Sequence, residues 1–195
     1  MSITCTTGKL YTTAANQTQE TPDAALLHAI AGGDKHAMRI LFARHRVRIY
    51  RFLLRLVSDE STAEDLVNEV FLDVWRQAGR FANRSSVSTW LMAIARFKAL
   101  SVRRRRTEAE LDEKIESTIA DPADDPEIVL EKKNQGELLR QALMNLSPDH
   151  REVIDLVYYH EKSVEEVAQI VGVPSATVKT RMFYARKKLA EMVAA

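Results

Sequence analysis

A run of carboxylates divides this chain into two parts. The stretch from Glu108 to Glu127 contains nine acidic residues and only one base, Lys114. It also contains Pro122 and Pro126. A charged, proline-containing segment with little apolar periodicity stays extended in water and adds nothing to a packed core. The pattern predicts a flexible acidic linker over residues 108–134, with a folded unit on either side.

Each of the two flanking units carries a basic cluster without any acid. Residues 96–106 contain six bases, and residues 174–190 contain five. The formal net charge of +1 hides this separation, and charge distribution matters more than the sum for binding nucleic acid. The composition therefore leaves nucleic-acid binding open.

The apolar spacing is helical throughout, and no segment alternates with period two for long enough to predict a strand. Low glycine and proline contents, six and five residues, agree with helices. We expect an all-α chain of two small helical domains joined by the flexible linker, the second containing a helix-turn-helix. The expected division is a disordered leader over residues 1–21, a first domain over 22–107, the linker over 108–134 and a second domain over 135–195.

Local signals place the helix starts. Ser61 with Glu64, and Ser163 with Glu166, have the Ser-x-x-Glu spacing of a capping box. Further N-caps are expected at residues that precede or follow a proline: Thr21, Ser147 and Ser175.

The cysteine count, the apolar runs and the search for catalytic motifs indicate where the protein is located and which class it belongs to. A single cysteine, Cys5, cannot form an internal disulfide, and no apolar run approaches 18 residues. We expect a cytoplasmic protein without membrane insertion. There is no Gly-rich phosphate loop, and the five histidines lack ligand-like partners at useful spacing, so no catalytic residue, metal or cofactor is predicted.

The stretch from Val164 to Met182 fits a helix-turn-helix. Gly172 stands where the chain must turn, and the following helix would bury Val178 and Met182. Such a helix can enter the major groove of DNA with its N-terminal side chains on base edges. The alternative is a helical hairpin with a basic face exposed to water.

The first unit combines a polar loop with the other basic helix. Hydroxyl and arginine side chains near Phe81–Ser88 could hold an unstacked base, as in single-strand binding proteins. Alternatively, Trp90 and Phe97 are core residues, and Arg103–Arg106 is only a solubilising helix end. The preceding helix has an acidic exposed side, which indicates either a protein partner or an ordinary solvated face.

Three segments resemble one family. Residues 63–75 (AEDLVNEVFLDVW) are similar to the core-polymerase-binding helix of bacterial sigma factors, and residues 88–96 to their promoter-melting segment. Residues 164–189 resemble their C-terminal helix-turn-helix. With only two domains, the chain resembles the small extracytoplasmic-function (ECF) group. It differs at Phe97 and Ser101, where many members have Asn and Asp, and at Tyr184, where an Arg is common.

The resemblance implies three sets of site residues. The set expected to bind core RNA polymerase is Asp65, Leu66, Asn68, Glu69, Leu72 and Asp73. The set expected at the −10 promoter element is Asn83, Arg84, Ser85, Ser86, Ser88, Arg96, Lys98, Arg103 and Arg104. The set expected at the −35 element is Ser175, Thr177, Lys179, Thr180, Arg181, Phe183, Tyr184 and Lys187.

The resemblance also implies the partners. These are core RNA polymerase, through its clamp helices and flap, promoter DNA, and an anti-sigma factor that controls the protein, which is a monomer when free. Two alternatives remain open: a helix-turn-helix repressor, and a sigma mimic that sequesters an anti-sigma factor.

Overall fold

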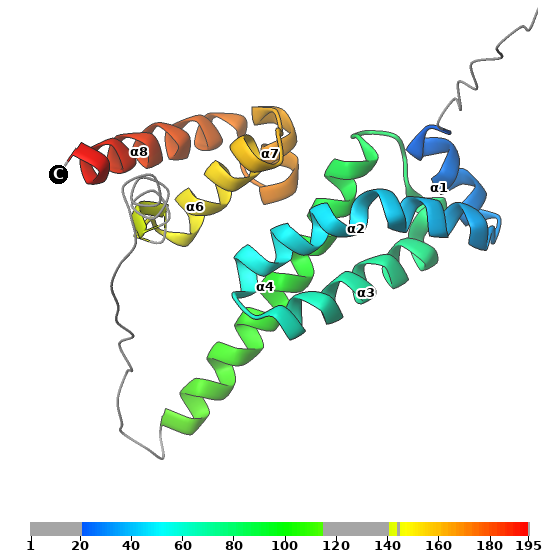
Figure 1. Ribbon diagram of the computed structural model, residues 1–195, viewed down its shortest axis with the longest axis horizontal. Helices are drawn as coiled ribbons and strands as arrows, with labels where there is room; N and C mark the ends of the chain where they lie inside the picture. Colours follow the sequence, from blue (N-terminus) through cyan, green and yellow to red (C-terminus); the bar gives the residue numbers. More distant parts are fainter. Residues whose placement is uncertain (1–20, 115–140, 144, 195) are drawn as a thin grey trace, which may run out of the picture.

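The computed structural model describes residues 21–114, 141–143 and 145–194. Side chains are described throughout these ranges except at residues 107–114 and 193–194. This part of the chain forms helices and no strand, as expected for an all-α fold (Figure 1). The elements are α1 (Asp23–Ala31), α2 (Lys35–Val57), α3 (Glu60–Gln77), η1 (Ala78–Arg80), α4 (Val87–Lys114), α6 (Pro148–Ile154), η2 (Asp155–Tyr159), α7 (Val164–Val171) and α8 (Ser175–Ala194).

The N-terminal unit, residues 21–114, is a bundle in which α1, α3 and α4 pack against the long α2. The turn before α2 ends at Asp34, whose carboxylate accepts hydrogen bonds from the backbone N–H groups of His36 and Ala37. Apolar side chains at helical spacing then fill the bundle, and Leu41, Phe52 and Leu91 are completely buried.

The C-terminal unit, residues 141–143 and 145–194, is built from α6, the π-helical segment η2, α7 and α8. The capping box of Ser163 and Glu166 is present at the start of α7, as predicted. Helix α7 ends at Gly172, whose φ of 75° is the left-handed conformation that glycine adopts at little cost. This turn directs α8 across α7, so that Val178 and Met182 are buried as predicted.

Three predicted caps are wrong. Ser61 lies inside α3, because Asp59 takes the N-cap position and accepts from the Thr62 N–H at 2.8 Å. Thr21 is not a cap, since Pro22 holds that position, and Ser175 is the first residue of α8. Ser147 holds the predicted N-cap position, but its side chain makes no capping hydrogen bond.

The two units are in contact rather than separate. Helix α7 packs against α4, and buried residues of both units, such as Phe52 and Leu156, belong to one continuous apolar cluster (Figure 1). The Phe52 ring meets the buried His160 ring edge to face at 5.4 Å. The predicted leader up to residue 20 and the predicted linker from residue 115 lie outside the described residues, whereas α4 continues through residues 108–114.

No helix within the described ranges combines the length and the apolarity needed to cross a lipid bilayer.

Candidate nucleic-acid interface

Helix α8 presents a basic and aromatic outer face. Its inner side is held by Val178, Met182 and Ala185, all buried. One helical step away, Lys179 and Lys187 are exposed, and Phe183 is 64% exposed. The same spacing that buries one side of the helix therefore places Lys179, Phe183 and Lys187 of the predicted −35 set in solvent.

Two of the predicted −35 residues are engaged within the protein. Arg181 forms an ion pair with Asp149 of α6, and its side chain is only 23% exposed. The Thr180 hydroxyl donates to the Ala176 carbonyl at 3.0 Å. Ser175 and Thr177 are half-buried at the start of α8, while Tyr184 is exposed and meets the Phe183 ring at 5.5 Å.

The loop before α4 has the character expected of a base-binding site at its tip. Asn83 holds a positive φ of 52°, and Asn83 and Arg84 are exposed. Asparagine is one of the residues that tolerate the left-handed backbone conformation, which is often found at turns and functional loops. Trp90 is half-buried, and its ring packs against that of Phe81 at 5.3 Å between ring centroids, where the loop begins.

The C-terminal side of this loop meets the other unit in a compact polar cluster. Glu166 accepts hydrogen bonds from the Ser86 hydroxyl at 2.9 Å and from the Thr89 hydroxyl. Lys162, which is 7% exposed, donates to Ser88 at 2.6 Å, to Thr89 at 3.0 Å and to Glu166 at 3.0 Å. We call Ser86, Ser88, Thr89, Lys162 and Glu166 the latch cluster.

The latch cluster stabilises the ionised form of Glu166. Burial by itself raises the pKa of this carboxyl, but the hydrogen bonds from Thr89, Lys162, the Ser163 backbone and Ser86 outweigh it and lower the pKa to about 2. The carboxylate is thus charged at neutral pH and lies next to the buried ammonium of Lys162.

Arg96 and Lys98, both in the predicted −10 set, are paired with acids. Arg96 binds Glu152 of α6 through two hydrogen bonds, of 2.7 and 3.2 Å. Lys98 lies 3.0 Å from Glu69 and 2.9 Å from Asp73. Burial lowers the pKa of the Lys98 ammonium, but these two hydrogen bonds outweigh it and the pKa is raised.

The exposure of three more predicted −10 residues and of Phe97 completes the description of this surface. Ser85 is half-buried, and Arg103 and Arg104 are exposed on α4. The C-terminal part of this helix extends beyond the bundle (Figure 1). Phe97 is 75% exposed, so it is not a core residue.

The acidic side of α3 is mostly available to a partner. Asp65, Asn68 and Glu69 are exposed, and Leu72 is 47% exposed beside them. Asp73 is half-buried in its ion pair with Lys98. Leu66 does not fit the prediction, because it is 2% exposed and packs in the core, on the opposite side of the helix.

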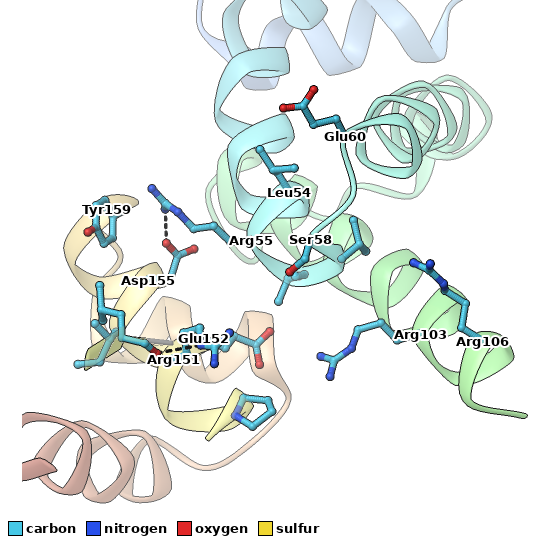
Figure 2. A pocket seen from close by; sticks show the side chains of 15 residues that line it. Leu54, Arg55, Ser58, Glu60, Arg103, Arg106, Arg151, Glu152, Asp155 and Tyr159 are labelled. Carbon is cyan, nitrogen blue, oxygen red and sulfur yellow. Dashed lines mark hydrogen bonds and ion pairs between the residues drawn. The ribbon is translucent and has the colours of Figure 1, made fainter. Parts of the chain in front are cut away.

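A groove of about 940 Å³ runs between the units (Figure 2). The end of α2 forms one wall and α6 with η2 the other, joined by the ion pair between Arg55 and Asp155. Arg103 and Arg106 extend from α4 toward the groove, and apolar side chains such as Leu54 and Ile154 line it. The groove therefore combines an apolar lining with a basic rim.

Sequence reasoning missed the residues that join the units. Lys162, Glu152, Arg55 and Asp155 carry no motif, and Glu166 was expected only as part of a capping box. A buried lysine is rare without a partner, but the sequence around Lys162 gives no sign that it is buried.

Comparison with known proteins identifies both units. Residues 41–109 match the family model described as Sigma-70 region 2, and residues 136–189 match the one described as Sigma-70, region 4. RNA polymerase sigma factor CarQ of Myxococcus xanthus is 33% identical over 83% of this chain and 91% of its own length. RNA polymerase sigma factor YlaC of Bacillus subtilis is 31% identical over 76% of this chain and 87% of its own length. ECF RNA polymerase sigma factor SigK of Mycobacterium bovis is 28% identical over 85% of this chain and 90% of its own length.

Solved structures give the same assignment. The sigma factor RpoE of Bartonella quintana, crystallised with the anti-sigma factor NepR, is 29% identical, with a TM-score of 0.63 over 80% of this chain and 96% of that one. CnrH in complex with the cytosolic domain of CnrY shares the fold, with a TM-score of 0.64 at 24% identity over 88% of this chain and 97% of that one.

Proposed function

The chain belongs to the sigma-70 family of RNA polymerase sigma factors, in its ECF group, and we propose that it binds core RNA polymerase and directs it to promoters. The observation that carries this proposal is the agreement between the family matches and the surfaces. The region 2 match covers the acidic face of α3 and the loop before α4, and the region 4 match covers the basic face of α8.

Core polymerase docks on the exposed side of α3, formed by Asp65, Asn68, Glu69 and Leu72. This side combines two carboxylates with an exposed leucine, which suits a partner surface that is both basic and apolar. Leu66 is not part of this surface, because it is buried.

The −10 element binds at the loop before α4. Asn83 and Arg84 at the exposed tip take an unstacked base, and the hydroxyls of Ser85, Ser86 and Ser88 supply hydrogen bonds around it. Flipping a base out of the duplex costs a few kcal/mol, which these contacts offset. Arg96, Lys98, Arg103 and Arg104 follow along α4, where cations bind the phosphate backbone; Arg96 and Lys98 first exchange their carboxylate partners for phosphates.

The −35 element binds as duplex to α8. Lys179 and Phe183 project from the exposed side of the helix, with Ser175, Thr177, Thr180, Arg181, Tyr184 and Lys187 around them. The N-terminal turns of this helix enter the major groove and Lys187, farther along, lies at the phosphates. Arg181 must release Asp149 to reach a base.

An anti-sigma factor controls the protein, and the groove between the units is where we place it. The basic rim at Arg103 and Arg106 and the apolar lining fit an amphipathic helix with acidic residues on its exposed edge. The sigma factor RpoE of Bartonella quintana was crystallised with an anti-sigma factor, NepR.

The protein makes and breaks no covalent bond, and it acts in the cytoplasm, where the polymerase and the DNA are. Its chemistry is recognition, and the polymerase supplies catalysis.

In vitro transcription tests the proposal. Purified chain is added to core polymerase on a library of random promoter sequences, and start-site-selective transcripts are expected. Failure to select any start site on any template would refute the sigma-factor function.

A charge reversal tests the docking surface on α3. Asp65→Lys is expected to lower core affinity by about 30-fold or more, because breaking a charge pair at an interface costs about 2 kcal/mol or more. Glu64→Lys, the same change on the neighbouring side of α3, is the control. Glu69 is a poorer choice, since it also pairs with Lys98. Equal core affinities of the two variants would place the docking surface elsewhere.

A further inference from the structure

Helix α2 is a third basic segment without any acid. Seven of its 23 residues are lysine or arginine, and none is aspartate or glutamate. The proposed function uses basic side chains of α4 and α8 but none of α2. Basic residues clustered along one helix indicate an anionic partner, and a polyanion such as nucleic acid above all.

Four of these bases lie on one side of α2. Arg44, Arg48, Arg51 and Arg55 follow one another at helical spacing, at intervals of four, three and four residues. At 1.5 Å per residue the row extends about 16 Å, or about five phosphate intervals of one DNA strand at 3.4 Å each. We call these four residues the arginine row.

The two ends of the arginine row are held by acids of neighbouring elements. Arg44 donates a hydrogen bond of 2.8 Å to Asp23 of α1. Arg55 forms an ion pair with Asp155 of η2, which Figure 2 shows at the end of α2. The row therefore runs along the outside of α2 from α1 to the C-terminal unit.

The middle of the row has no acid beside it. Arg48 and Arg51 are exposed, and in the described part of the chain neither forms an ion pair. The acids of α3 face another side of α2: burial and the charges of Glu60 and Glu64 raise the pKa of Tyr50. Tyr50 is two residues from Arg48, and residues two apart on a helix point in nearly opposite directions. The two central guanidinium groups are thus available to an anionic partner.

The chemistry of the row favours phosphate over a protein partner. All four residues are arginine, whose planar guanidinium binds a phosphate through two parallel hydrogen bonds. The acidic side of α3 suits a basic surface of core polymerase, and such a surface would repel the row. A protein interface also needs an apolar centre, and Val47 is the one large apolar residue that is exposed on α2, a helix described over its whole length.

The position of the row favours DNA as the source of the phosphate. Helix α1, which binds the first residue of the row, also contacts η1, directly before the loop that is proposed to hold the −10 element. A strand bound at that loop is a polyanion that continues on both sides of it. Backbone contacts of this kind add affinity and fix the path of the DNA, but they carry no sequence information.

We propose that the arginine row of α2 is a further DNA-binding site, which holds the phosphate backbone of promoter DNA without reading its sequence. Arg48 and Arg51 make the central contacts. Arg44 and Arg55 join them by exchanging their carboxylate partners for phosphates. This inference rests on the proposed function, since that function makes DNA the ligand.

The test measures binding of the free, full-length chain to a dye-labelled DNA duplex of random sequence at a series of salt concentrations. The test variant combines Arg48→Gln with Arg51→Gln. The matched control combines Lys35→Gln with Arg39→Gln, which removes the same charge from exposed positions of the same helix outside the row. Far-UV circular dichroism establishes that both variants keep their helices.

The test variant is expected to bind the duplex about tenfold more weakly than the wild-type chain at about 0.1 M salt. The slope of log K against log salt should become shallower by about two, because each phosphate contact contributes about 0.9 to it. The control should keep the wild-type slope. Replacing the same two residues by lysine should retain the slope but not the full affinity, since lysine does not bind a phosphate in two places. An unchanged slope in the test variant, or the same change in the control, would overturn the proposal.

Cross-linking locates the contact directly. In a Cys5→Ser chain, a photoactivated cross-linker is attached at Val47→Cys, next to the row, or at Leu72→Cys on the acidic side of α3. These positions have similar exposure in the wild-type chain, 50% and 47%. The duplex is expected to cross-link at position 47 and not at position 72. Equal cross-linking at the two positions would also contradict the proposal.

Core-polymerase affinity of the same variants separates the remaining outcomes. If the test variant loses core affinity while its DNA affinity and salt slope stay those of the wild type, the row binds protein and the proposal is wrong. The DNA measurements need no polymerase. A chain that binds DNA through the row but never directs transcription would therefore refute the proposed function and leave the row as a DNA-binding site.

Discussion

The turn of the helix-turn-helix offers a prediction whose size follows from the backbone. Gly172 has a φ of 75°, and a Cβ built on it meets no atom within 4 Å. Gly172→Ala therefore causes no collision, and its cost is that of holding an L-residue in the left-handed region, about 1–2 kcal/mol. Gly172→Asn should cost less, because asparagine tolerates this conformation.

Gly79 in η1 is the matched control. It has no positive φ, and an added Cβ would lie 3.7 Å from the Ala31 Cβ, an ordinary contact. Gly79→Ala should stabilise the protein by about 0.4–1 kcal/mol, because it reduces the freedom of the unfolded chain. The two glycine substitutions are thus expected to have opposite signs.

Urea unfolding, followed by two probes, measures both effects. Trp75 and Trp90 are the only tryptophans, so fluorescence reports the N-terminal unit while far-UV circular dichroism reports all helices. If the units unfold together, Gly172→Ala lowers the midpoint of both signals; if they unfold separately, it lowers only the dichroism transition. A Gly172→Ala protein at least as stable as wild type, with an unchanged m-value, would refute the backbone argument.

Three further predictions concern DNA binding, the core and pH. Lys179→Ala should weaken binding of a −35 duplex taken from the selected promoters by about 1–3 kcal/mol in an electrophoretic shift assay, and an unchanged affinity would remove α8 from the groove. Phe52→Ala should lower the free energy of unfolding by about 3–5 kcal/mol, since the ring is fully buried and touches His160; a loss below 1 kcal/mol in urea would contradict this packing. Energy transfer between dyes on the two units, at His36→Cys and Glu191→Cys in a Cys5→Ser chain, should be constant from pH 7 to pH 5. It should then fall as pH drops from the ordinary pKa of a glutamate, 4.5, toward the pKa of about 2 of Glu166, because the lowered pKa stabilises the closed form only while the carboxylate is ionised. Glu166→Gln leaves Lys162 without a charged partner in the latch cluster and should lose this fall in energy transfer below pH 5. A pH profile identical to that of the wild-type chain would show that other groups hold the units together.

Helices and their buried sides could be predicted from the sequence because both depend on residues a few positions apart. The burial of Val178 and Met182 follows from helical spacing, and the left-handed turn at Gly172 follows from the need to stop α7 and start α8. The stretches that resemble sigma factors are likewise local, and the family matches confirm the family that they indicate.

Some local signals failed because two residues competed for one position. Ser61 has a capping-box partner at the correct spacing, yet Asp59, two residues earlier, accepts the Thr62 N–H and starts the helix. Leu66 belongs to the segment that resembles the core-polymerase-binding helix, but that resemblance could not decide which apolar residue of the helix is buried and which is exposed.

From its sequence alone, this chain is two helical units that carry the motifs of one family, since helix formation and motif chemistry are encoded over short distances. Only the tertiary structure revealed that the units close on each other. The hydrogen bond from Lys162 to Ser88 joins residues 74 positions apart, and that from Ser86 to Glu166 joins residues 80 positions apart. Pairings of this kind depend on how whole helices pack, and no periodicity or spacing in the chain records them.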